Sequence, residues 1–256
     1  MDITGSSSVV TGGASGLGEA TARLLAERGS HVVVVDMNED KGEAVATDIT
    51  GVFVKADVAN PEQVIAAVEA AKEMGPLKTM VTAAGIGYAT RTIGKDGQYD
   101  SAHDLDIYRK VLEVNLVGTF NCVRLGATAM SQNEADEDGC KGAIVTVTSV
   151  AAFDGQIGQA SYSASKGGVV GMTLPMAREL ARFGIRVATI APGIFWTPMV
   201  DGMPPAVQES LSASIPFPSR LGKPDEFAQT VAFILTNRYI NGETIRLDGA
   251  VRLAAK

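Results

Sequence analysis

The chain has 256 residues, enough for one large domain or two small ones at roughly 100–200 residues per domain. Apolar residues make up 46% and charged residues 20%, which excludes a disordered chain, a collagen-like fibre and a disulfide-stapled miniature. The 22 Lys and Arg against 29 Asp and Glu leave a net charge of −7. Because the sequence also has no basic run, nucleic acid is a poor partner.

The two cysteines and the N-terminal residues indicate in which cellular compartment the protein is expected. Cys122 and Cys140 form no CxxC pair, which is typical of a reducing compartment. No apolar run approaches the roughly 18 residues of a membrane-spanning helix. Residues 1–5 resemble neither a secretory signal nor a transit peptide. We therefore expect a cytoplasmic protein with no membrane partner.

Strand-like and helix-like segments alternate along the chain. Residues 32–35 are consecutive valines, typical of a strand that is buried on both faces. The alternation predicts βαβ units, and hence an α/β fold in which a parallel sheet carries helices on both faces. No linker divides the chain, so we expect a single domain over residues 1–256. The predicted strands are 8–11, 32–35, 52–56, 79–82, 143–148, 186–190 and 243–247; the predicted helices are 19–28, 61–74, 105–130, 161–183 and 224–235.

Three longer stretches, 87–104, 131–142 and 195–219, interrupt the alternation. The third carries five prolines around a short helical patch, and it begins where a strand ends, at the edge where open α/β sheets bind ligands. We predict that it is a substrate lid. Its apolar side chains suit an acyl chain or a steroid, or they pack the lid onto the body; they are Phe195, Trp196, Met199, Val200, Met203 and Leu211.

A glycine-rich run lies between the first predicted strand and the first predicted helix. Glycines let the backbone approach a phosphate closely, and a helix N-terminus supplies free N–H groups and a partial positive charge. The run therefore predicts the phosphate site of a dinucleotide, although a tight turn alone would also use glycines. The residues expected to contact the cofactor here are Gly12, Ser15, Gly16, Leu17 and Gly18.

Asp36 ends the second predicted strand. A carboxylate at this place accepts hydrogen bonds from both hydroxyls of an adenosine ribose and repels a 2′-phosphate. No Lys or Arg lies in the glycine run or directly after Asp36, which favours NAD over NADP. After the third strand, Asp57 and Val58 are candidates for the adenine edge, with a helix-capping Asp as the alternative.

Ser149, Tyr162 and Lys166 form the candidate catalytic set. Tyr162 and Lys166 are four residues apart in a helical pattern and so share a face, while Ser149 directly follows a predicted strand. A nearby ammonium and an oxidised nicotinamide would lower the pKa of the phenol enough for it to act as a base. Ser149 would hydrogen-bond the reacting oxygen. His31 and His103 lie far apart and outside any ligand-spaced cluster, so we expect no metal.

Together these motifs resemble the short-chain dehydrogenase/reductase family over nearly the whole chain; they are Thr11-Gly12-xxx-Gly16-x-Gly18, Asn115, Ser149, Tyr162-xxx-Lys166 and Pro192-Gly193. The resemblance implies a single Rossmann-like, doubly wound domain with about seven parallel strands, usually in a homotetramer. It implies Tyr162 as acid and base, Ser149 as substrate hydrogen-bonder, and Lys166 on the nicotinamide ribose. Asn115 would hold a water that links Lys166 to solvent. The further cofactor contacts it implies are Ala84, Gly85, Tyr162, Lys166, Pro192, Gly193, Phe195 and Thr197.

One position departs from the family pattern. The fourth strand of the family usually runs into Asn-Ala-Ala-Gly, whereas this chain has Thr82-Ala83-Ala84-Gly85. A Thr hydroxyl can replace only part of the hydrogen bonds of that Asn. We expect a modest local adjustment and intact catalysis.

Several longer stretches resemble the 3-hydroxyacyl-CoA dehydrogenases of this family, a subgroup that also acts on 3-hydroxy-2-methylbutyryl-CoA and 17β-hydroxysteroids; they are 150–159, 171–175, 216–222 and 241–250. The resemblance implies NAD-dependent oxidation of a 3-hydroxyacyl-CoA to a 3-oxoacyl-CoA. The alternatives are a 3-oxoacyl-carrier-protein reductase, against which Asp36 argues, a hydroxysteroid dehydrogenase, and a catalytically silent nucleotide-binding scaffold. The expected substrate is thus a small molecule, an acyl-CoA thioester or a steroid-like alcohol.

Overall fold

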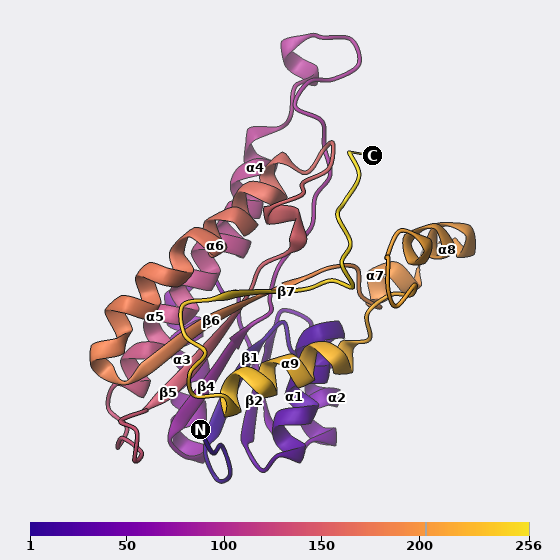
Figure 1. Cartoon of the computed structure of the whole chain (residues 1–256). Helices are drawn as coiled ribbons and strands as arrows, with labels where there is room; N and C mark the ends of the chain where they lie inside the picture. The colour runs from indigo at the N-terminus through magenta and orange to yellow at the C-terminus, as the bar shows by residue number, and fades with distance from the viewer. Residues whose placement is uncertain (203, 256) are drawn as a thin grey trace.

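A seven-stranded parallel sheet forms the centre of the computed structural model, which describes residues 1–202 and 204–255 and all their side chains except those of Pro198 and Met199 (Figure 1). The strand order is β3-β2-β1-β4-β5-β6-β7. The chain therefore reverses direction across the sheet between β1 and β4, where doubly wound folds bind nucleotides. The strands are β1 (Ser7–Thr11), β2 (His31–Asp36), β3 (Val52–Lys55), β4 (Leu77–Thr82), β5 (Gly142–Val147), β6 (Ile185–Pro192) and β7 (Thr244–Leu247). All seven predicted strands are present, and the predicted fold class is confirmed.

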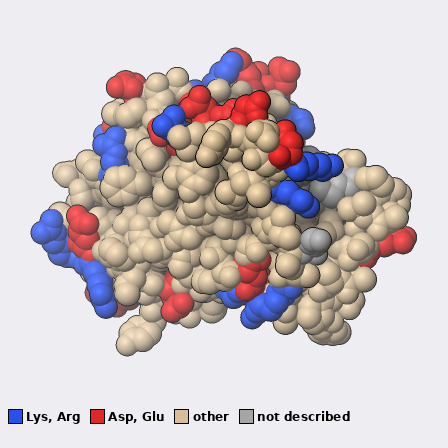
Figure 2. Space-filling view, turned by 90° about the horizontal axis from the view of Figure 1, so that it is seen from above, with Lys and Arg blue, Asp and Glu red and all other residues tan. Residues whose placement is uncertain are grey.

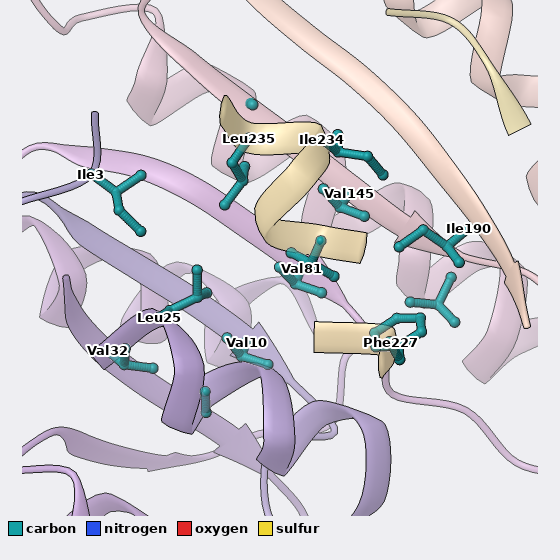
Figure 3. Packing of buried hydrophobic residues seen from close by; sticks show 14 of the residues in the cluster. Ile3, Val10, Leu25, Val32, Val81, Val145, Ile190, Phe227, Ile234 and Leu235 are labelled. Carbon is teal, nitrogen blue, oxygen red and sulfur yellow. The ribbon is translucent and has the colours of Figure 1, made fainter. Parts of the chain in front are cut away.

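Helices cover both faces of the sheet. Neighbouring residues of a strand point to opposite faces, so Val9 and Val10 of β1 belong to two different hydrophobic clusters. Val10 packs with helices α1 (Gly16–Glu27), α2 (Glu39–Asp48) and α9 (Pro224–Thr236), and Figure 3 shows this cluster around Phe227 and Leu25. On the other face Val9 packs with α3 (Pro61–Met74), α5 (Gly118–Met130) and α6 (Ala160–Leu180).

Two helical segments differ from the sequence prediction. The continuous helix expected over 105–130 is divided into α4 (Leu105–Leu112) and α5 by one wider π-helical turn, Glu113–Val117, in which Gly118 N–H donates to Glu113 O. Such turns are frequent at functional sites, and this one contains Asn115. Helix α2 was not predicted, because small residues make up its buried face and give only a weak helical pattern.

The long interruptions are loops with short helical turns. Residues 87–104 project from the body and contain the turn Tyr99–Ser101 (Figure 1). The predicted lid contains α7 (Pro198–Asp201) and α8 (Pro205–Ala213). Within the described ranges, none of the helices has the length and apolarity needed to cross a bilayer.

The apolar residues of the lid have different surroundings. Phe195 lies in the core, and Val200 and Leu211 pack against Ile215, Leu221 and Val251, so these three side chains join the lid to the body. Trp196 is 37% exposed. Met203 and the side chain of Met199 lie outside the described residues.

Candidate active site

A cleft of about 620 Å³ lies at the carboxyl ends of β1, β2 and β4. It is the place at which the reversal of strand order leaves a crevice between neighbouring connections. The structure brings to this cleft a group of the predicted cofactor residues, namely Gly12, Ser15, Gly16, Leu17, Gly18, Asp36, Asp57, Val58, Ala84, Gly85 and Thr197.

The glycines of the cleft permit close packing of backbone. Gly12 has φ +67°, and a Cβ on it would lie 2.7 Å from Ala84 N. A Cβ on Gly18 would lie 2.1 Å from Gly12 O. The loop after β1 is therefore pressed against both the loop after β4 and the first turn of α1, whose N-cap is Ser15. This leaves the α1 N-terminus directed at the cleft, as a phosphate site requires.

Asp36 holds the loop after β1 from the neighbouring strand. Its Oδ2 accepts from Ala14 N–H at 3.2 Å, and its Oδ1 accepts from Asn38 N–H at 3.0 Å. Lys110 is the one positively charged side chain among the described residues that line the cleft. Its Nζ lies 3.9 Å from Asp57 Oδ2. The local charge around Asp36 is thus negative, which disfavours a phosphate on the ribose.

Asp57 does not cap the following helix. The N-cap of α3 is Asn60, whose side chain accepts from Gln63 N–H at 3.0 Å. Asp57 Oδ1 instead accepts from Ala59 N–H at 3.0 Å, inside the turn before the helix. This removes the structural alternative named above and leaves the Asp57 carboxylate on the cleft wall.

The three candidate catalytic residues come together at the ends of β5 and α6. Ser149 follows β5, and its Oγ accepts from Ala151 N–H at 3.1 Å. Tyr162 is hydrogen-bonded to Ser149 and lies one helical turn before Lys166, whose Nζ is 5.8 Å from the centre of the phenol ring. Lys166 Nζ also donates to Val147 O at 3.0 Å.

Burial sets the protonation of this group. It raises the pKa of the Tyr162 phenol, while the hydrogen bond with Ser149 acts in the opposite direction. Burial lowers the pKa of the Lys166 ammonium to about 8. A phenolate at Tyr162 therefore needs positive charge beside it, and the Lys166 ammonium lies next to the ring.

The side chain of Asn115 hydrogen-bonds the backbone of Ile86, in the loop after β4. Its Oδ1 accepts from Ile86 N–H at 2.8 Å, and its Nδ2 donates to Ile86 O at 2.9 Å and to Ser165 Oγ at 3.1 Å. Gly85 passes close to the same groups, since a Cβ on it would lie 3.2 Å from Asn115 Oδ1 and 3.5 Å from Lys166 Nζ. The side chain of Asn115 is thus occupied by protein partners, and its role in holding a water stays a prediction.

Five predicted cofactor residues lie outside the lining of the cleft. Tyr162 and Lys166 belong to the catalytic group described above, and the other three are Pro192, Gly193 and Phe195. Pro192 ends β6, and Gly193 N–H donates to Leu247 O at 2.9 Å. The Phe195 side chain is 7% exposed and meets Phe227 edge to face at 6.4 Å between ring centres. Because that side chain packs in the core, only the backbone of Phe195 is available to a ligand.

Seven lining residues were not predicted as site residues, namely Val35, Met37, Ala56, Ala83, Ile86, Lys110 and Val114. Lys110 and Val114 are four residues apart on the helical segment that leads to Asn115. That spacing was the available signal, because residues four apart share a helix face.

Thr82 stands where the family pattern has Asn. Its hydroxyl is buried and, within the part of the chain that the structure describes, has no hydrogen-bond partner. The loop it precedes is instead held by Thr11, whose Oγ1 accepts from Ala84 N–H at 3.2 Å. The Thr hydroxyl therefore does not take over the role of an Asn, and the loop after β4 still closes on β1.

Comparison with known proteins agrees with this geometry. The family model described as short chain dehydrogenase matches residues 7–207. The chain belongs to this family. It is 50% identical over 255 residues to 3-hydroxyacyl-CoA dehydrogenase type-2 of Homo sapiens, covering 98% of this chain and 97% of that one. The protein of the same name from Drosophila melanogaster is 50% identical over 249 residues, covering 96% and 97%. The crystal structure of 3-hydroxyacyl-CoA dehydrogenase type-2 from Mycobacterium avium has a TM-score of 0.94 and 45% identity, covering 98% of each chain.

Replacing Lys166 tests the buried ammonium. An ammonium whose folded-state pKa is about 8, against 10.5 in the unfolded chain, makes stability rise with pH between these values, because the unfolded state binds more protons. The free energy of unfolding of wild type, minus that of Lys166→Met, should rise by about 2 kcal/mol between pH 7 and 10. Urea unfolding at several pH values measures it, and a pH-independent difference would contradict a buried, charged Lys166.

Proposed function

We propose that the protein is an NAD-dependent dehydrogenase that oxidises the 3-hydroxyl of a 3-hydroxyacyl-CoA, including 2-methyl-branched ones, to the 3-oxoacyl-CoA. The observation that carries the proposal is the joining of Ser149, Tyr162 and Lys166 at one end of the sheet, next to a dinucleotide-sized cleft. The names of the close relatives support the choice of substrate.

In this mechanism Ser149 and Tyr162 bind the substrate oxygen from two sides. Tyr162 takes the hydroxyl proton, and as charge builds on the oxygen, the Ser149 hydroxyl stabilises it by hydrogen bonding. Bound NAD supplies the hydride acceptor and a positive charge. Lys166 keeps its ammonium below pH 8, where it lowers the pKa of the neighbouring phenol and returns the abstracted proton toward solvent.

The cofactor proposal rests on the fit of the cleft to NAD. The backbone cradle at Gly12, Gly16 and Gly18 and the adjoining α1 N-terminus suit a pyrophosphate. Asp36 would accept from the ribose hydroxyls, and Asp57 with Val58 would border the adenine. The nicotinamide end would lie toward Tyr162, Lys166 and Thr197, with Pro192, Gly193 and the backbone of Phe195 beyond.

An acyl-CoA brings phosphates to a protein of net charge −7. Figure 2 views the molecule from above the long loops of Figure 1 and shows Lys and Arg in small groups between Asp and Glu. Attraction for the CoA phosphates would therefore come from a few neighbouring Lys and Arg side chains and not from the net charge of the protein. A steroid-like alcohol is the alternative substrate, and a silent scaffold is disfavoured because a retired site has no reason to keep all three catalytic residues.

We further propose a homotetramer. Helices α5 and α6, with the turns before α5 and after α6, expose large apolar side chains on the outer layer of the molecule; they are Val117, Phe120, Leu174 and Phe183. Exposed apolar groups of this size on adjoining helices favour association with a second copy.

A cytoplasmic location is part of the same proposal. Cys122 and Cys140 are both free. Burial raises the pKa of the Cys122 thiol to about 12, so it remains a protonated, unreactive packing group. Free thiols in these surroundings suit a reducing compartment.

The catalytic assignment is tested by Tyr162→Phe. Without the phenol the substrate oxygen has no proton acceptor in the oxidation and no proton donor in the reduction, so kcat should fall about 1000-fold in both directions. Initial rates with NADH and acetoacetyl-CoA, a 2-methylated homologue and a steroid ketone measure the effect and rank the substrates. Tyr239→Phe, at a 99% exposed position, is the control. A Tyr162→Phe protein with an undiminished rate would refute the mechanism, and a preference for the steroid would refute the substrate.

The cofactor assignment is tested at Asp36. Wild type should use NAD in preference to NADP, and Asp36→Ala should reduce that preference by about 10- to 100-fold, because two ribose hydrogen bonds and the repulsion of a 2′-phosphate are lost. The ratio of kcat/KM for the two cofactors measures it, with Asp40→Ala, an exposed acid, as the control. A tenfold preference of wild type for NADP would be incompatible with the role of Asp36.

The tetramer is tested with Phe120→Glu, which places a charge on the exposed apolar surface of α5. Light scattering coupled to size-exclusion chromatography should give a tetramer for wild type and a smaller species for the variant. Tyr99→Glu, on the projecting loop, should leave the mass unchanged. A monomeric wild type, or a variant that stays tetrameric, counts against this surface.

A further inference from the structure

One segment of the chain contacts both the predicted lid and the connection between Ser149 and Tyr162. This segment is the tail, residues 248–255, which follows β7 and runs alongside the loop that precedes α6 (Figure 1). The loop, residues 150–159, joins the two catalytic residues that bind the substrate oxygen. Its position therefore bears directly on the reaction.

Arg246, in β7, fastens the tail to this loop. Its guanidinium donates to Asp154 Oδ2 at 2.5 Å and lies 5.2 Å from the centre of the Phe153 ring. The same guanidinium donates to Asp248 Oδ2 at 2.8 Å and to Val251 O at 3.2 Å. The side chain of Arg246 is only 23% exposed and that of Asp248 only 8%. Charge-assisted bonds at this depth are stronger than ordinary surface ion pairs.

Further along, two backbone carbonyl oxygens of the tail accept hydrogen bonds from the loop. Gln156 Nε2 donates to Ala254 O at 3.0 Å, and Ile157 N–H donates to Ala255 O at 3.0 Å. The loop continues this chain of contacts, because Gly158 O accepts from Thr90 N–H at 2.8 Å. The tail thus lies along the loop from Asp154 to Ile157 rather than touching it at one point.

The opposite side of the tail packs against the lid. Val251 is 1% exposed and lies in one apolar cluster with Val200 of α7, Ile215 and Leu221. Leu253 adds to this cluster from the tail and Leu211 from α8. The tail therefore has a polar side bonded to the loop and an apolar side buried against the lid.

We propose that the tail, held by Arg246, is a positioning and specificity element of the reaction. It fixes the separation between the lid, which would cover the substrate chain, and the loop that carries Ser149 toward Tyr162. The inference rests on the proposed dehydrogenase function. Arg246 is a positioning residue, since it acts on Ser149 only through the loop.

Substitution of Arg246 tests this role. Arg246→Met should lower kcat/KM for acetoacetyl-CoA about tenfold while the Kd of NADH, measured by fluorescence, stays within twofold. Arg246→Lys keeps the charge and one donor toward Asp154, and it should restore at least a third of the lost activity. Arg238→Met removes an arginine that also pairs with several carboxylates, those of residues 136–138. It lies between α9 and β7, at the amino ends of the strands, and its loss should leave kcat/KM unchanged.

A truncation and an exchange measurement complete the test. Removing residues 252–256 deletes Leu253 and both backbone acceptors, and should raise the KM for acetoacetyl-CoA at least fivefold with kcat within threefold. In Arg246→Met and in the truncated protein, amide hydrogen exchange over 150–158 should become at least tenfold faster, with β6 unchanged. An unchanged kcat/KM, an unchanged exchange rate, or a loss of rate matched by weaker NADH binding would each overturn the proposal.

These outcomes separate the tail from the proposed function. If wild type reduces the steroid ketone and not the acyl-CoA, the proposed substrate is wrong, and the same variants are compared with the ketone. If wild type reduces neither, the proposed function fails, and the exchange rates still decide whether the tail holds the loop.

Discussion

Lys166 is held at two points, by the last residue of β5 and by Thr148 directly after it. Lys166 Nζ donates to Val147 O at 3.0 Å, and the carbonyl oxygen of Lys166 accepts from Thr148 Oγ1 at 2.6 Å. These bonds determine where α6 lies along β5, and therefore bring Tyr162, one turn earlier, to Ser149. Burying the Lys166 ammonium lowers the stability of the folded protein, because the charge leaves water, and burial lowers its pKa to about 8. In the proposed mechanism this loss of stability is accepted because the ammonium acts on the Tyr162 phenol.

A second constraint is the close approach of backbone at the point where the strand order reverses. The loop after β1 touches the loop after β4 through Gly12, and Gly85 leaves room for Asn115 and Lys166. Asn115 ties the same loop to the π-helical turn and, through Ser165, to α6. The cofactor cleft and the catalytic group are consequently parts of one hydrogen-bonded unit, so displacement of one side moves the other.

Much of the fold could be predicted because its signals are local. A run of valines marks a buried strand, and residues four apart mark one helix face, so all seven strands and the Tyr162–Lys166 pair follow from neighbouring residues. Helix α2 was missed because Gly42, Val45 and Ala46 form too small an apolar face. The π-helical turn was missed because its residues are ordinary helix formers. Phe195 was predicted to contact the cofactor, and packing against Phe227 and Gly222 in the core leaves its backbone to make such a contact.

Residue types and spacings were enough to predict the seven strands in chain order, the glycines of the cleft and the candidate catalytic side chains. These depend on residue type and on short spacings, which the chain displays directly. Three features depend on the folded chain: Lys110 and Val114 border the cleft, Asn115 hydrogen-bonds Ile86, and the tail joins the lid to the loop after Ser149. Gln156 and Ala254 are 98 positions apart, and no local pattern encodes a contact between segments that meet only when the sheet has formed.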